Sequence, residues 1–214
     1  MTYEELKIQL DLNNPIDVLK SVGRKTKDWN WFVICNEGDC HLFNNNGNEI
    51  DVKKIKSLYE KIIPKNIKKI IVPDSVQSIE YETFYGCEKL TSITIPDSVK
   101  NIKVSAFANC INLISISIPD SVESIESYAF YACESLASIN IPDSTKYIGG
   151  AVFTFCENLT SIVIPDSVEY IGFRTFFFCK NLKSLTFKGK TIDQVKSMEY
   201  YPFGLADESI IKCI

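Results

Sequence analysis

Three residue types recur at a fixed spacing and could support chemistry. The cysteines could bind a soft metal or form disulfides, the aspartates could bind calcium, and the serines could supply nucleophiles. Each type advances by 23 residues from one copy to the next. The three columns are Cys87, Cys110, Cys133, Cys156 and Cys179; Asp74, Asp97, Asp120, Asp143 and Asp166; and Ser75, Ser98, Ser121, Ser144 and Ser167.

A structural role explains each column better than catalysis or metal binding does. One cysteine per repeat behaves as a small apolar residue and is expected to be buried. Each aspartate follows a proline, and its carboxylate is expected to accept from the backbone N–H two residues later. The serine hydroxyl is expected to bond the backbone of the adjacent repeat. A serine nucleophile needs a base beside it, and the only histidine, His41, lies outside the repeats.

Cys35, Cys40 and His41 form a second cluster of candidate ligands. Zinc normally takes four nitrogen or sulfur ligands, and no CxxC or HxxxH spacing supplies them here. Cys213 is the only other cysteine outside the repeats. A disulfide between Cys35 and Cys40 would require an oxidising compartment, so their redox state stays open. The sequence therefore predicts no catalytic residue, no cofactor and no metal site.

The three columns belong to one repeated phrase, of which Leu90–Cys110 is a clear copy. Ile93 and Ile95 alternate with polar residues, which predicts a strand with one buried face. Pro96 lacks the N–H that would continue a ladder and is expected to end this strand. A second extended piece, Val99–Ile102, follows, and then a short helical turn that buries the phenylalanine and the cysteine. Stacked copies would align identical side chains about 4.8 Å apart.

The full pattern, CxxLTSIxIPDSVxxIxxxAFxxC, resembles the BspA-like (Treponema-type) leucine-rich repeats over residues 67–187. The resemblance implies a right-handed, β-rich solenoid. It also implies a recognition module or a surface adhesin, and it implies no catalytic residues. We therefore expect an α/β repeat solenoid, a leucine-rich-repeat superhelix built from 23-residue repeats.

The chain divides into three parts. Residues 1–66 lack the repeat and are expected to form a small α+β cap, and residues 188–214 are expected to form a helical cap. Solenoid ends need such covers because terminal repeats otherwise leave apolar surface in water. The elements predicted in the two caps are helices at 3–10, 16–22 and 52–63, a hairpin joining 31–35 to 40–43, a helix at 191–198 and a strand at 210–214.

Composition argues against several function classes. The 214 residues carry a net charge of −4, whereas a nucleic-acid binder would need a basic face. Residues 1–14 carry charges where a signal peptide has an apolar core, and no apolar run is long enough to span a membrane. We therefore predict no nucleic-acid partner and no membrane insertion. A cytoplasmic or particle-associated location is expected in preference to secretion.

A protein partner is the expected ligand, and the concave face of the solenoid is the first candidate surface. Each strand would show two small and almost uncharged side chains there, which suits protein contact and is poor for catalysis. The first column contains Lys69, Ser92, Ser115, Ser138, Ser161 and Ser184, and the second contains Ile71, Thr94, Ser117, Asn140, Val163 and Thr186.

Extra rings at the carboxy-terminal end form the second candidate surface. Phe173, Phe177 and Phe178 are not required by the repeat, and exposed aromatic patches are uncommon on soluble monomers. Either the ring-rich segment 200–203 covers them, or a partner or a second copy of the chain does. The sequence thus predicts a non-enzymatic interaction or recognition module. The alternative is a structural component of a larger particle, such as a virion or phage subunit, or a surface adhesin.

Overall fold

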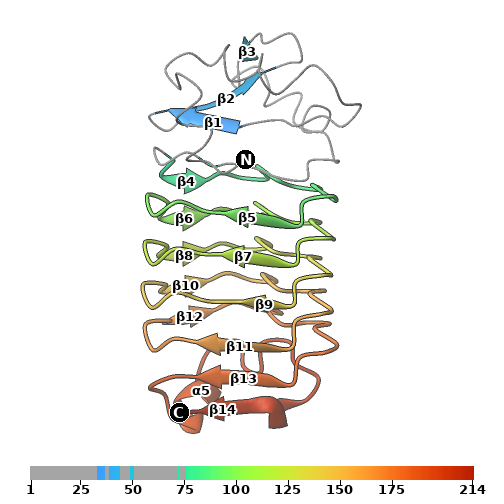
Figure 1. Ribbon diagram of the computed structural model, residues 1–214. Helices are drawn as coiled ribbons and strands as arrows, with labels where there is room; N and C mark the ends of the chain where they lie inside the picture. Colours follow the sequence, from blue (N-terminus) through green and yellow to red (C-terminus); the bar gives the residue numbers. More distant parts are fainter. Residues whose placement is uncertain (1–32, 37–38, 44–48, 51–71, 73–75) are drawn as a thin grey trace.

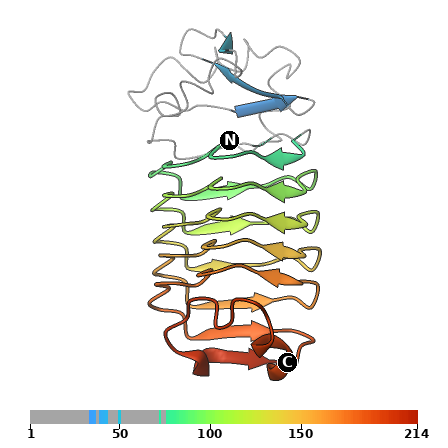
Figure 2. The same cartoon turned by 180° about the vertical axis from the view of Figure 1, so that it is seen from behind.

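The repeats form a β-solenoid of about six turns, in which each turn of about 23 residues lies on the preceding one (Figure 1). The computed structural model of the chain describes residues 33–36, 39–43, 49–50, 72 and 76–214. The expected solenoid of stacked repeats is therefore confirmed. Successive turns descend as a regular stack when the molecule is seen from behind (Figure 2).

Each repeat contributes one strand to a first strand row, because isoleucines alternate there with small polar residues. Ile93 is buried whereas its neighbours Ser92 and Thr94 are exposed. Neighbouring strands are parallel and in register, so that Ser92 lies opposite Ser115. The row comprises β5 (Ser92–Thr94), β7 (Ser115–Ser117), β9 (Ser138–Ile139), β11 (Ser161–Ile164), β13 (Ser184–Phe187) and β14 (Ile211–Cys213).

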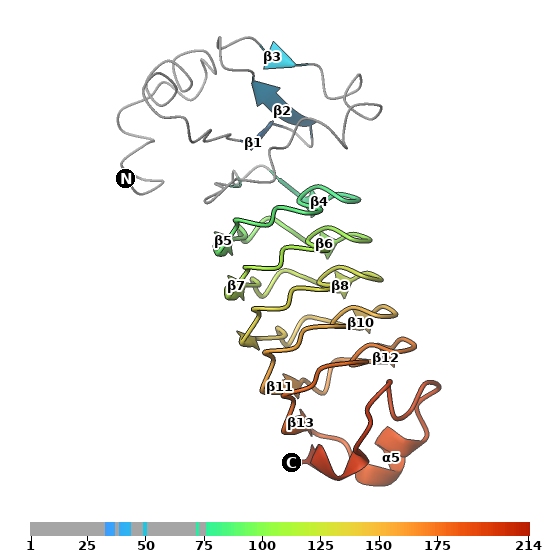
Figure 3. The same cartoon turned by 90° about the vertical axis from the view of Figure 1, so that its right-hand side faces the viewer.

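A second strand row follows the proline turns. The N–H of Val99 donates to the carbonyl of Pro96 at 3.1 Å, and this closes a β-turn between the two strands of a repeat. Val99 and Ile102 are buried, as predicted. The two rows run down the stack as separate columns (Figure 3). The second row comprises β4 (Ser78–Ile79), β6 (Asn101–Ile102), β8 (Ser124–Ile125), β10 (Tyr147–Ile148) and β12 (Tyr170–Ile171).

The third side of each repeat, which we name the turn edge, is a run of tight turns and not the predicted short helix. Ser105 and Asn109 have φ angles of 57° and 61°, a left-handed conformation that interrupts an α-helix. The N–H of Ala108 donates to Ser105 within the repeat, whereas the N–H of Phe107 donates to Ala129 of the next repeat at 2.8 Å. Every second amide therefore donates its hydrogen bond to the next repeat, whereas the amides of an α-helix would all donate within the repeat.

The core consists of side-chain columns that cross the repeats. One column is a stack of phenylalanine rings whose neighbouring centroids lie between 5.1 and 5.8 Å apart. The five repeat cysteines are buried, as predicted. Because each ring contacts the ring of the next repeat, burial couples the stability of neighbouring turns. The stacked rings are Phe84, Phe107, Phe130, Phe153 and Phe176.

The carboxy-terminal segment continues the last repeat. The N–H of Phe176 donates to the carbonyl of Phe203 at 2.9 Å, where earlier repeats use a carbonyl of the next repeat. The Phe203 ring is buried 6.0 Å from that of Phe187. The segment contains helix α5 (Ile192–Lys196), within the predicted helix, and a 3-10 helix, η1 (Glu208–Ile210), that leads into β14. The helix and the strand predicted for this end are therefore present.

A three-stranded antiparallel sheet is formed by β1 (Val33–Asn36), β2 (Asp39–Phe43) and β3 (Glu49–Ile50). Cys35 lies opposite Cys40 in the β1–β2 pair, so the predicted hairpin is confirmed. The helices predicted at 3–10, 16–22 and 52–63 lie outside the described residues, as do Lys69 and Ile71.

Candidate functional site

The outer side of the first strand row is a small, uncharged surface, which we name the polar face. Its side chains alternate with the buried isoleucines and leucine, so that two per strand point away from the core. No member carries a titratable group, so this face can donate and accept hydrogen bonds but cannot transfer protons near neutral pH. The polar face comprises Ser92, Thr94, Ser115, Ser117, Ser138, Asn140, Ser161, Val163, Ser184 and Thr186.

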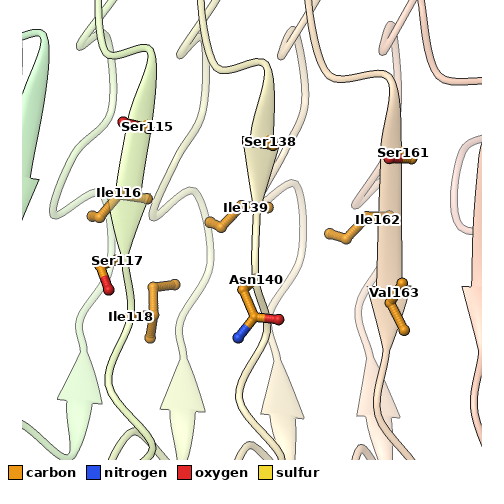
Figure 4. A pocket seen from close by; sticks show the side chains of 10 residues that line it. All are labelled: Ser115, Ile116, Ser117, Ile118, Ser138, Ile139, Asn140, Ser161, Ile162 and Val163. Atoms are coloured by element: carbon orange, nitrogen blue, oxygen red, sulfur yellow. The ribbon is translucent and has the colours of Figure 1, made fainter.

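The middle of the polar face is hollowed. A depression of about 450 Å³ lies over β7, β9 and β11. Figure 4 shows its lining as rows that cross the three strands. One row is Ser115, Ser138 and Ser161, the second is Ile116, Ile139 and Ile162, and the third is Ser117, Asn140 and Val163. Because the isoleucine side chains belong to the core, the accessible groups in the hollow are small polar side chains, one valine and the backbone between them.

The strand ladder is interrupted within this hollow. Strands β5, β7 and β9 form one sheet and β11, β13 and β14 another, and β9 and β11 are not hydrogen-bonded neighbours. Asn140 follows β9 at the place of Thr94, Ser117 and Val163 in the other repeats. Asparagine is disfavoured in strands, and β9 is only two residues long. The hollow therefore coincides with the least regular part of the first strand row.

Most of the residues predicted for the concave face lie together. Ser92 and Thr94 on β5 and Thr186 on β13 extend the polar face on the two sides of the hollow. Lys69 lies outside the described residues. The role of these predicted residues in binding stays a prediction. The predicted residues that line the hollow are Ser115, Ser117, Ser138, Asn140 and Ser161.

The rings at the carboxy-terminal end are only partly covered by the chain itself. Tyr200 packs edge-on against Phe173, with ring centroids 6.0 Å apart. Phe177 is half-buried, but Phe173 and Phe178 remain 57% and 49% exposed. The Arg174 guanidinium lies 5.0 Å from the centre of the Phe173 ring and 4.9 Å from that of Phe177. Tyr200 thus covers part of this surface and leaves the Phe173 and Phe178 rings partly exposed.

These rings continue a longer line of contacts, which we name the aromatic edge. Neighbouring centroids along it lie between 4.7 and 5.7 Å apart. Only Phe177 and Phe178 of this surface were predicted from the sequence, because its members are spread over three repeat positions and each position carries a ring in only some of the repeats. The aromatic edge comprises Tyr128, Tyr131, Phe155, Phe178 and Phe177.

The serine column is structural, as predicted. The Ser98 hydroxyl donates to the carbonyl of Val76 in the preceding repeat at 2.6 Å, and Ser121, Ser144 and Ser167 make the equivalent bond. Each bond ties two repeats together. These hydroxyls point at backbone carbonyls and not at a general base, so the arrangement does not activate them.

The prediction for the aspartate turns was wrong in one respect. Asp97 is exposed, and its carboxylate does not take the backbone bond expected of it, because the Val99 N–H donates to the Pro96 carbonyl. The same backbone bond closes the described turns that contain Asp120, Asp143 and Asp166. Within the described part of the chain, no group of three His, Cys, Asp or Glu side chains is close enough to hold a metal ion.

The buried thiols donate to backbone carbonyls. Cys133 Sγ lies 3.2 Å from the carbonyl oxygen of Phe107, and Cys110, Cys156 and Cys179 make the same contact in their repeats. Burial raises the pKa of the Cys133 and Cys156 thiols well above their usual range. The pKa of the Cys110 thiol is also raised well above its usual range. The largest cause is the contact with the Cys87 thiol, and the second is burial. Burial raises the pKa of Cys179 to about 12.

We expect native Cys110, Cys133 and Cys156 to resist alkylation, because the attacking species is the thiolate and these thiols are buried and protonated. Half-buried Cys213 is the control within the same molecule. Peptide mass spectrometry after N-ethylmaleimide treatment near neutral pH should show Cys213 modified at least about a hundredfold faster. Equal rates would mean that the repeats open readily or that the column is exposed.

Among the helices of the described ranges, none has both the length and the apolar character that a bilayer crossing requires.

Comparison with known proteins agrees with the fold. A family model described as a BspA type leucine-rich repeat region (6 copies) matches residues 56–183 and 147–207. The crystal structure of a leucine-rich repeat protein of T. pallidum is similar at 35% identity and a TM-score of 0.55, over 56% of this chain and 58% of that one. A leucine-rich cell surface protein of Faecalibacterium prausnitzii matches at 29% identity and a TM-score of 0.43, over 56% of this chain and 39% of that one. No curated protein matches the sequence.

Proposed function

The chain belongs to the BspA-type leucine-rich repeat family, and from this premise we propose that it is a non-enzymatic module that binds a protein partner through the polar face. The observation that carries the proposal is the hollow over β7, β9 and β11, which is lined by exposed small side chains. The matched part of the chain spans little more than half of the T. pallidum protein that it resembles.

The chemistry of the polar face favours a partner that is neutral at the contact. Small side chains such as serine, threonine and valine lose little rotamer freedom when they are buried, so ordering them costs little free energy. They are held by strands on a packed core, and a rigid, preformed surface suits complexes in which the backbone moves little. Because the polar face carries no charge, association through it should depend only weakly on salt concentration.

Ser138→Arg provides the test of this proposal. The long cationic side chain would enter the hollow, whereas the fold should be unaffected because Ser138 is exposed. We expect partner capture from extracts of the native host to fall at least about tenfold with an unchanged Tm. The matched control is Glu169→Arg at an exposed position beside β12, outside the polar face.

Capture that is equal in the wild type and Ser138→Arg would contradict the polar face as the binding surface. The alternative function, a structural component of a larger particle or an adhesin, is favoured by the exposed Phe173 and Phe178 rings. It makes a different prediction in the same experiment. Binding or assembly would then survive in Ser138→Arg and fail in Phe178→Ser, again at an unchanged Tm.

A further inference from the structure

The chain holds one of its own cations on the turn edge in a defined way. Lys180 Nζ lies 2.7 Å from Glu157 Oε1 and 5.8 Å from the centre of the Phe178 ring. The glutamate belongs to the preceding repeat, and the ring belongs to the repeat of the lysine. A carboxylate and an aromatic face, contributed by two adjacent repeats, therefore hold a single positive charge.

A glutamate and a phenylalanine occupy the equivalent positions one repeat earlier, where no lysine follows them. Glu134 and Phe155 precede Glu157 and Phe178 by 23 residues, and the residue that corresponds to Lys180 is Glu157 itself. Glu134 is exposed, and no lysine or arginine in the described ranges forms an ion pair with it. The carboxylate and the ring are thus repeated, whereas Glu157 stands at the position of the lysine.

The backbone at the two copies is equivalent. The N–H of Asn158 donates to the carbonyl of Glu134 at 3.1 Å, and the N–H of Asn181 donates to the carbonyl of Glu157 at 3.3 Å. Phe155 and Phe178 both have a left-handed backbone, with φ angles of 62° and 58°. The side chains of the earlier copy therefore start from the same places as those that hold Lys180.

The earlier copy also has an additional aromatic wall. The rings of Tyr131 and Phe155 have centroids 5.5 Å apart and are inclined at 89° to each other. Tyr128, which is 47% exposed, packs edge-on against Tyr131. The ring of Tyr131 therefore stands beside the ring of Phe155, and a cation near either ring would gain a cation–π attraction in addition to that of the Glu134 carboxylate.

We propose that Glu134 and Phe155, with Tyr131 beside them, bind an arginine side chain of a partner protein. The chain's own cations support arginine over lysine. The Arg174 guanidinium lies 4.9 and 5.0 Å from two ring centres, closer than the 5.8 Å of Lys180, and a planar guanidinium can stack on a ring. The net charge of −4 favours the approach of a basic segment. This site lies on the turn edge and is independent of the polar face.

A titration with three blocked peptides, acetyl-Gly-Xaa-Gly-amide with arginine, lysine or citrulline in the middle, tests the proposal. NMR amide shifts of the full chain report where each peptide binds. The arginine peptide should shift the signals of Glu134 and Phe155 and bind about twofold to fivefold more tightly than the lysine peptide. The citrulline peptide, which has nearly the same shape and no charge, should not bind measurably.

Glu134→Gln should weaken the arginine peptide about twofold to fivefold and leave the Tm unchanged, because the residue is exposed. Phe155→Leu should weaken it by a similar factor, and Tm is checked for this variant because the ring is half-buried. Glu169→Gln controls for general attraction to an acidic chain. Equal weakening in Glu169→Gln and Glu134→Gln, or equal binding of arginine and citrulline peptides, would overturn the proposal. Tighter binding of the lysine peptide would overturn the assignment to arginine.

Discussion

Raising the pH from about 8 to about 10 should markedly destabilise this protein, because four of its buried thiols stay protonated in the folded state while the unfolded chain ionises them. The unperturbed pKa of these thiols is 9.0, and the folded chain holds the pKa of each above that value. The unfolded chain therefore loses these protons first as the pH rises. Below about pH 8 the protonated thiols make their full contribution to the free energy of unfolding. That contribution declines as the pH rises above the unfolded pKa, and the decline ends when the folded pKa of each thiol is reached.

The expected loss is large. An unfolded thiol with a pKa of 9.0 gains about 1.4 kcal/mol by ionising between pH 8 and about pH 10, and the folded chain gains almost nothing over that range. Four thiols together remove several kcal/mol, which is a substantial part of the free energy of unfolding of an ordinary domain. The thiols concerned are Cys110, Cys133, Cys156 and Cys179.

Urea unfolding at a series of pH values, with a phosphine reductant present, measures this loss. Cys133→Ala is the control, because it removes one of the four thiols. Its absolute stability will be lower, owing to the cavity, but its decline with pH should be smaller by about a quarter. A free energy of unfolding that stays constant between pH 8 and about pH 10 would show that the thiols ionise in the folded chain.

The sequence predicted the strands and the core because both follow from the order of residues within one repeat. Ile93 and Ile95 alternate with polar residues, and Pro96 marks the end of the strand. The Ser98 hydroxyl bond to the preceding repeat followed from the need to satisfy a buried carbonyl. These inferences needed no knowledge of how far apart the repeats lie.

The turn edge was predicted wrongly because its conformation depends on the neighbouring repeat. Ala106, Phe107 and Cys110 are spaced as on a short helix, and nothing within the repeat contradicts that interpretation. The amide of Phe107 instead donates to Ala129, one repeat further on. The left-handed residues that allow this are seldom glycine, and Phe155 and Phe178 are two of them. The usual sequence signal for a positive φ is therefore missing.

The candidate sites were likewise predictable only where they follow from the order of residues within one repeat. The alternation of buried and exposed residues predicted which side chains form the polar face. It did not predict the hollow, which depends on the interrupted pairing between β9 and β11. The proposed site at Glu134 and Phe155 could be inferred only from the structure, because the inference rests on analogy with the contact of Lys180 with Glu157 and Phe178.

Gly172→Ala should destabilise the fold by about 3 kcal/mol, since it is an overpacking substitution against backbone. A Cβ at Gly172 would lie 2.4 Å from the backbone nitrogen of Gly150 and 2.6 Å from the carbonyl carbon of Gly149. Backbone atoms held by the repeat ladder cannot move aside as the end of a flexible side chain can. The clash would push apart the repeats that carry β10 and β12. Tyr147 and Tyr170 on these strands stack with centroids 4.8 Å apart and an angle of 1° between their planes.

Gly150→Ala is the matched control, because it adds the same methyl group to an adjacent position in the same stack. Its nearest contact would be 3.3 Å, to the carbonyl oxygen of Phe173, and its backbone does not have a positive φ. We expect its free energy of unfolding to stay within about 1 kcal/mol of the wild type, with a small gain if the unfolded chain is stiffened. Thermal unfolding and the near-ultraviolet circular dichroism of the tyrosine stack should both change in Gly172→Ala and stay unchanged in Gly150→Ala. Equal melting temperatures for the two variants would show that the repeats can separate at little cost at this position, and that the close approach at Gly172 does not stabilise the stack.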